Sequence, residues 1–171
     1  MERVGRPDDM SDLEWLVAIE EIRQLKAKRD RYVDAHDWDA YEALHAPDHV
    51  SHNDGQVAWT SSAEMIANVS RIMDGMITAH HSYSPEILFD TATTARGIWS
   101  MIDGIVTNVD GRDTWSFKFG YYYETYEKRE GRWLFTSRRW HDYFGTGPNG
   151  VTFPRQMPMG SDAWLHILQP R

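Results

Sequence analysis

Residues 112–144, RDTWSFKFGYYYETYEKREGRWLFTSRRWHDYF, decide the fold of this chain. Large aromatic and β-branched residues recur in this stretch with the period of two that is typical of β-strands. Glu130-Gly131 divides it into two strands, and Asp110-Gly111 marks a further turn just before it. We therefore expect a meander of long antiparallel strands. Its members are segments 82–90, 95–108, 113–128 and 132–144.

Upstream of this sheet the apolar residues change to a period of 3.6, which indicates helices. Residues 12–36 predict an amphipathic helix, and Asp37 is a suitable cap for a second, short one. Ser61-x-x-Glu64 has the pattern of a capping box at the start of a third helix. Residues 48–59 predict a short strand and a turn. Three helices followed by a long-stranded sheet predict an α+β fold, in which a bent sheet wraps a helix and encloses a cavity.

Length and composition restrict the classes of function. A chain of 171 residues fits one domain, which we place at 12–145 after a leader at 1–11. We expect the tail at 146–171 to contain a short helix near 161–168 and to cover the cavity or a neighbouring subunit. The net charge of −8 disfavours nucleic acid as a partner, and no apolar run is long enough to span a membrane. The absence of cysteine and of a secretory signal fits a cytoplasmic protein.

Charged residues in unusual places are the first candidates for chemistry. Arg29 lies in the middle of the apolar stripe of the first helix, where it snorkels to the edge, pairs with a core acid or points into the cavity. Asp34 lies off that stripe, near the helix end. His81 lies where the sheet begins, and an acid partner would make it a general base. Arg138 and Arg139 are adjacent on the last long strand, so they leave opposite faces and one of them can enter the cavity.

A metal site is the alternative use for the histidines. His45, His49 and His52 lie close together in the sequence, but Pro47 should break a helix between the first two. No established zinc-ligand pattern is present. We therefore expect no metal.

Three segments resemble a known family. Residues 22–48, IRQLKAKRDRYVDAHDWDAYEALHAPD, resemble the opening of SnoaL-like proteins in the nuclear transport factor 2-like superfamily, whose fold is a cystatin-like α+β cone. HHSYSPEILFD followed by TTARGIW, and YYYETYEKREGRWLFTSRRW, resemble the later strands of that fold. Within the superfamily the chain is most similar to the group of scytalone dehydratase, hexachlorocyclohexane dehydrochlorinase and bile acid 7α-dehydratase.

This resemblance implies a site without a cofactor, in which a histidine base is held by an aspartate of the first helix. The aspartate falls on Asp34 and the histidine on His81, whereas Arg29 stands where those enzymes have Lys or Tyr. Their late-strand arginine falls on Arg138 or Arg139. Their strand-one tyrosine has no counterpart here, because only His52, Asn53 and Trp59 lie nearby.

The sequence as a whole therefore predicts a cofactor-independent lyase, dehydratase-like or dehydrochlorinase-like, or an isomerase that acts on a hydrophobic cyclic small molecule. The alternatives are a non-catalytic ligand-binding or assembly subunit of the same fold, and a polyketide-cyclase-like or hydrolase-like enzyme. We expect the substrate to contact His52, Trp59, Tyr32, Tyr121 and Trp99. The rings on both faces of segment 113–126 further predict a homo-oligomer, a trimer in preference to a dimer.

Overall fold

The computed structural model describes residues 6–53 and 56–152. Two helices, α1 (Asp12–Asp34) and α2 (Trp38–Glu42), come first, and α3 (Ser62–Ile72) follows two short strands. These strands are β1 (His45–Asn53) and β2 (Gln56–Trp59). The rest of the sheet consists of β3 (Ile77–Thr91), β4 (Thr94–Val109), β5 (Arg112–Arg129), β6 (Arg132–Gly147) and β7 (Gly150–Thr152).

Local side-chain contacts set the helix boundaries. Ser11 and Glu14 form a capping box at the start of α1, and Asp37 caps α2 through the amide of Ala40. At α3 the predicted capping box is only half present. Ser61 accepts from the amide of Glu64, but the Glu64 carboxylate accepts from the amide of Thr60 instead. The predicted helix starts are confirmed.

The sheet has the strand order β2-β1-β6-β5-β4-β3, with β7 paired to the end of β6. All pairs are antiparallel except β1 with β6, which is parallel. At both predicted dipeptide turns the two central residues have positive φ, +50° and +76° at Asp110-Gly111 and +50° and +77° at Glu130-Gly131. These values suit the right-handed twist of a hairpin, so the predicted meander is confirmed. The strand β3 begins at Ile77 rather than at residue 82.

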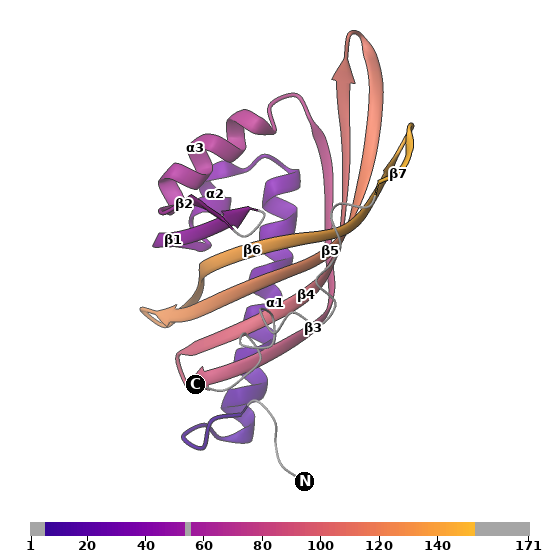
Figure 1. Ribbon diagram of the computed structural model, residues 1–171. Helices are drawn as coiled ribbons and strands as arrows, with labels where there is room; N and C mark the ends of the chain where they lie inside the picture. The colour runs from indigo at the N-terminus through magenta and orange to yellow at the C-terminus, as the bar shows by residue number, and fades with distance from the viewer. Residues whose placement is uncertain (1–5, 54–55, 153–171) are drawn as a thin grey trace.

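The helices cover one face of the sheet, which we call the inner face. Figure 1 shows α1 running across it, while α2 and α3 lie over the end near β1 and β2. The largest buried cluster joins α1 to the sheet and includes Ile22, Trp99, Tyr122, Tyr126 and Phe135. A second cluster joins α3 to α1 and α2. The turn between β4 and β5 extends beyond the helices (Figure 1). This arrangement is the predicted α+β cone with a curved, mostly antiparallel sheet.

The structure adds detail at both ends of the predicted domain. Met10 is 5% exposed and packs into the main cluster, so contacts with the core begin before residue 12. The predicted tail begins at residue 146, but the sheet continues through β7 to Thr152. The helix expected near 161–168 lies outside the described residues. None of the described helices is both long and apolar enough to span a membrane.

Candidate functional site

A cavity of about 340 Å³ lies between α3 and the inner face of the sheet. Most of its wall is apolar, and its aromatic and aliphatic side chains include Trp59, Val69, Met73, Ile105 and Trp140. Its polar side chains come from four neighbouring strands and are Thr78, His80, Asp103, Lys118 and Arg138. A larger hollow of about 460 Å³ lies between α1 and the start of β6, but it contains none of the predicted site residues. A few polar groups in an apolar cavity are typical of small-molecule sites.

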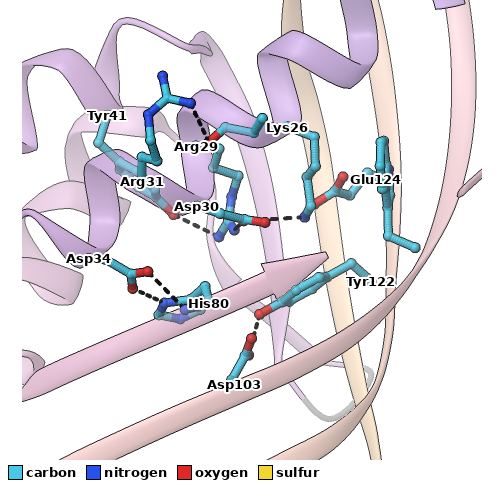
Figure 2. Close-up of polar contacts among 12 residues, drawn as sticks. Lys26, Arg29, Asp30, Arg31, Asp34, Tyr41, His80, Asp103, Tyr122 and Glu124 are labelled. Atoms are coloured by element: carbon cyan, nitrogen blue, oxygen red, sulfur yellow. Dashed lines mark hydrogen bonds and ion pairs between the residues drawn. The ribbon is translucent and has the colours of Figure 1, made fainter. Parts of the chain in front are cut away.

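Asp34 and His80 form a hydrogen-bonded pair, in which His80 lines the cavity. The last residue of α1 places the Asp34 carboxylate against β3, where Oδ1 lies 2.6 Å from His80 Nδ1 (Figure 2). The backbone amide of His80 donates to Oδ2 at 2.9 Å, and the Thr78 hydroxyl donates to Oδ1 at 2.8 Å. His36, in the left-handed region at φ +54°, ends the helix directly after this carboxylate. Three donors therefore hold Asp34 in one orientation.

The prediction that Asp34 pairs with His81 is wrong by one position. Successive side chains of a strand point to opposite faces, and it is His80 that points inward and is 8% exposed. His81 is exposed on the outer face, the face of the sheet away from the helices. His81 therefore lies on the wrong face of β3 to contact Asp34.

The hydrogen bonds of the pair define its charge and tautomer. Partial burial acts to raise the pKa of Asp34, but the hydrogen bonds from the His80 ring and amide and from Thr78 outweigh it, so this pKa lies below its ordinary value. An ionised carboxylate can only accept, so His80 Nδ1 carries the ring proton. The lone pair of a neutral His80 ring is then on Nε2, the nitrogen that a general base uses here.

Asp103 and Lys118 are polar residues of the cavity that the sequence did not point to. Asp103 lies directly opposite His80 in the β3–β4 pair, and Lys118 lies directly opposite Asp103 in the β4–β5 pair. The three form one row across the inner face. The register between strands cannot be predicted from one sequence. In the sequence pattern, a single acid or lysine within an aromatic strand looks like an ordinary surface residue. The period-two alternation alone could have placed Lys118 opposite to the rings of Phe117 and Phe119.

Arg29 is buried, as its position on the apolar stripe predicts, with 1% of its surface exposed. Its guanidinium donates to the Tyr41 hydroxyl at 2.8 Å and to Asp30 at 3.2 Å. It is not among the residues that line the cavity. Of the three alternatives for Arg29, the structure shows the pairing with a core acid.

Arg138 and Arg139 leave opposite faces of β6, as expected. Arg138 lines the cavity, with its guanidinium carbon 4.3 Å from the centre of the Tyr122 ring. Arg139 lies opposite Tyr123 of β5 and His52 of β1, and its positive charge helps to lower the pKa of His52, after burial. Arg138 is therefore the arginine that can reach a bound molecule.

Of the five side chains expected to contact the substrate, Trp59 alone is in the cavity wall. Trp99 is in the core, where its indole donates to the Tyr126 hydroxyl at 2.8 Å. Tyr32 packs against the α3 cluster, and the Tyr121 ring lies tilted against the rings of Tyr123 and Tyr143 on the outer face. His52 is also absent from the cavity wall.

Of the three histidines considered for a metal, His45 and His49 are buried and His52 is partly exposed. His45 Nδ1 donates to the carbonyl of Tyr41 and His49 Nδ1 to that of Phe135, and the two rings meet edge to face at 4.8 Å. Burial, first of all, lowers the pKa of His49 to about 4 and that of His45 well below its ordinary value. Within residues 6–53 and 56–152, no three His, Cys, Asp or Glu side chains converge as metal ligands would.

Comparison with known proteins identifies the family. The model of the SnoaL-like domain family matches residues 14–139, which is most of the chain. The chain belongs to the SnoaL-like family. Among solved structures, this SnoaL-like chain is similar to a scytalone dehydratase-like protein from Novosphingobium aromaticivorans, with a TM-score of 0.74 and 19% identity over 88% of this chain and 99% of that one.

Two further structures support the same fold for this SnoaL-like protein. A hexachlorocyclohexane dehydrochlorinase from Novosphingobium barchaimii has a TM-score of 0.71 and 18% identity over 85% of this chain and 100% of that one. A nuclear transport factor 2-like protein with a cystatin-like fold, from Novosphingobium aromaticivorans, has a TM-score of 0.62 and 19% identity over 96% of this chain and 99% of that one. The expected SnoaL-like family and the cystatin-like fold are thus confirmed.

Proposed function

We propose that this protein is a cofactor-independent lyase that eliminates water or HX from a hydrophobic cyclic small molecule, or an isomerase that moves a double bond in one. The observation that carries the proposal is the Asp34–His80 pair, with Nδ1 fixed at 2.6 Å from the carboxylate and Nε2 left for a substrate in an apolar cavity. The dehydratase and dehydrochlorinase names among structures of this fold support the same class.

The reaction balances with groups that the cavity contains. His80 Nε2 takes a proton from carbon, and the electron pair of that C–H bond forms the new double bond. Asp34 stabilises the imidazolium that results, and Arg138 stabilises negative charge on an activating oxygen or a departing group. A departing hydroxide takes the proton back from His80 and leaves as water, whereas a halide leaves as the anion. In an isomerase His80 returns the proton to another carbon.

Proton abstraction can be tested without the natural substrate. We would incubate the full chain with cyclic ketones, 2-indanone and 1-tetralone, in D2O and follow the loss of the α C–H signals by NMR. His80→Gln should slow the protein-dependent exchange about 100-fold or more, because general bases contribute about 10²–10⁴-fold. Asp34→Asn should also slow it, since the wrong tautomer of His80 becomes accessible.

His81→Gln is the matched control, because His81 neighbours His80 in sequence but is exposed on the outer face. It should leave the exchange rate unchanged. Full exchange in His80→Gln, or equal losses in the two histidine variants, would contradict the proposal. Cyclic ketones that bind to the wild type but exchange no faster than in buffer would favour the alternative, a non-catalytic ligand-binding protein of the same fold.

A further inference from the structure

Asp103 is a carboxylate built into the wall of the cavity. It lies on β4 and is 7% exposed, between His80 on one neighbouring strand and Lys118 on the other. Directly opposite residues of antiparallel strands have Cα atoms only about 4.5–5.5 Å apart. A group that reaches Asp103 from the cavity is therefore also close to His80.

One carboxylate oxygen of Asp103 has a hydrogen-bond donor within the protein. The Tyr122 hydroxyl donates to Oδ2 (Figure 2). Tyr122 is fully buried, and three cations face its ring: Lys26 Nζ at 3.9 Å, Arg138 at 4.3 Å and Arg29 at 5.4 Å from the centroid. The ring is held on several sides, so the hydroxyl fixes the direction of the carboxylate.

The other oxygen of Asp103 is buried and accepts no hydrogen bond from any described residue. A buried acceptor without a donor costs free energy, so native proteins rarely keep one unless water or a ligand supplies the donor. Asp103 belongs to the cavity wall. Because Oδ2 holds the hydrogen bond from the Tyr122 hydroxyl, Oδ1 cannot turn toward that hydroxyl. A molecule bound in the cavity can supply the missing donor, because Asp103 is part of the cavity wall.

We propose that Asp103 Oδ1 accepts a hydrogen bond from a hydroxyl group of the substrate, so that the cavity selects cyclic alcohols over the corresponding halides. A hydroxyl carries the required proton, whereas a carbon-bound chlorine carries none and brings a second electron-rich atom against the carboxylate oxygen. This inference rests on the proposed function, because it names the substrate class for the cavity that contains His80. Of the two proposed eliminations, loss of water and loss of HX, it assigns the loss of water to this protein.

The test uses two probes that differ only in this group, cyclohexanol and chlorocyclohexane. Neither has an activated C–H bond, so NMR titration, read at the indole N–H signals of Trp59 and Trp140, reports binding alone. The measured quantity is the ratio of the chloride Kd to the alcohol Kd. A hydrogen bond to a charged group is strong enough that Asp103→Asn should lower this ratio about tenfold relative to wild type.

Two further variants keep the result interpretable if Asp103→Asn does not fold. Asp103→Leu combined with Tyr122→Phe removes both partners of the buried hydrogen bond, which leaves no polar group unpaired, and should lower the ratio as much. Tyr122→Phe alone keeps the ring and the Asp103 carboxylate. Either carboxylate oxygen can then accept from the alcohol, so the preference for the alcohol should persist.

Each outcome decides the inference. A ratio that Asp103→Asn leaves unchanged, or that Tyr122→Phe alone abolishes, would overturn it. Failure of the proposed function can be told apart from failure of this inference. It appears as deuterium exchange in His80→Gln at the wild-type rate, whatever the two Kd values are. An intact alcohol preference without exchange would mean the right ligand class and the wrong reaction.

Discussion

Lys26 of α1 and Glu124 of β5 form a buried ion pair, with Nζ and Oε1 2.6 Å apart and each residue 1% exposed. Asp30 adds a second carboxylate 4.0 Å from the ammonium, and the Tyr126 hydroxyl donates to the other Glu124 oxygen at 2.6 Å. Burial, the largest influence, lowers the pKa of Lys26 to about 8 despite these two acids. The pair joins the longest helix to the centre of the sheet.

Removing one member of this pair should destabilise the fold strongly. Lys26→Met leaves the Glu124 carboxylate buried without its cation, and such single losses cost about 3–5 kcal/mol. Urea unfolding followed by circular dichroism would measure this cost. The double variant Lys26→Met with Glu124→Gln should recover much of the loss, since no uncompensated charge is then buried. A single variant within about 1 kcal/mol of wild type would contradict the prediction.

Arg29 should contribute to stability rather than to proton abstraction. Tyr41→Phe removes the hydroxyl that accepts from the buried guanidinium at 2.8 Å, and an unpaired buried donor costs about 1–3 kcal/mol. We expect this loss in urea unfolding, together with an unchanged rate of ketone deuterium exchange per folded molecule. A large fall in the exchange rate with an unchanged free energy of unfolding would instead indicate that Arg29 takes part in proton abstraction.

The fold should lose stability as the pH falls from about 6.5 toward 4. In the folded state the pKa of His49 is depressed by burial to about 4, so below pH 6.5 the unfolded chain binds a proton that the folded chain does not. The full effect for His49 is on the order of 3 kcal/mol, and buried His45 adds to it in the same direction. Urea unfolding at pH 7, 6 and 5 would measure the slope.

His49→Gln should reduce that slope, because the buried His49 imidazole no longer titrates. Exposed His81→Gln is the control and should leave it unchanged. Stability that is flat between pH 7 and 5 in the wild type, or equal slopes in wild type and His49→Gln, would show that the folded state accommodates the protonated ring.

The outer face of the sheet should be covered by further copies of the chain. Ile77 is 71% exposed, Trp115 44% and Phe117 41%, and they lie near one another because Ile77 pairs with Val106 and Val106 with Trp115. We expect a homo-oligomer, a trimer before a dimer. Light scattering should then give about three times the chain mass of 19.9 kDa.

Trp115→Glu combined with Phe117→Glu should shift this mass toward that of one chain, because two charges would be buried in the contact. Val57→Glu is the control, since Val57 is 58% exposed on β2 and far from those rings in the strand order. A wild-type mass of one chain at micromolar concentration would refute the oligomer. An unchanged mass in the double variant would place the contact elsewhere.

Local chemistry determined most of the fold. Asp110-Gly111 and Glu130-Gly131 allow the positive φ values of tight hairpins, so the long antiparallel strands were readable from these dipeptides and from the rings between them. The same holds for α1, whose apolar period of 3.6 placed Arg29 in the interior. Turn, cap and periodicity signals act within a few residues, which is why a sequence alone contains them.

The tertiary structure decided which face of each strand points inward. At the start of β3 the apolar residues Ile77 and Ala79 share the outer face with His81, while Thr78 and His80 point into the cavity. This inverts the usual pattern of apolar-in and polar-out, because the cavity needs polar groups and the outer face carries exposed rings. Hydrophobic alternation therefore could not choose His80 over His81.

The grouping of the remaining site residues also came only from the tertiary structure. The register of three strands places Asp103 between His80 and Lys118, and Arg138 of a fourth strand lines the same cavity. Register depends on the sum of many side-chain contacts across a whole sheet rather than on any motif. The sequence determined that these charged residues lie within strands, and the packing of α1 and α3 on the sheet determined that they share one cavity.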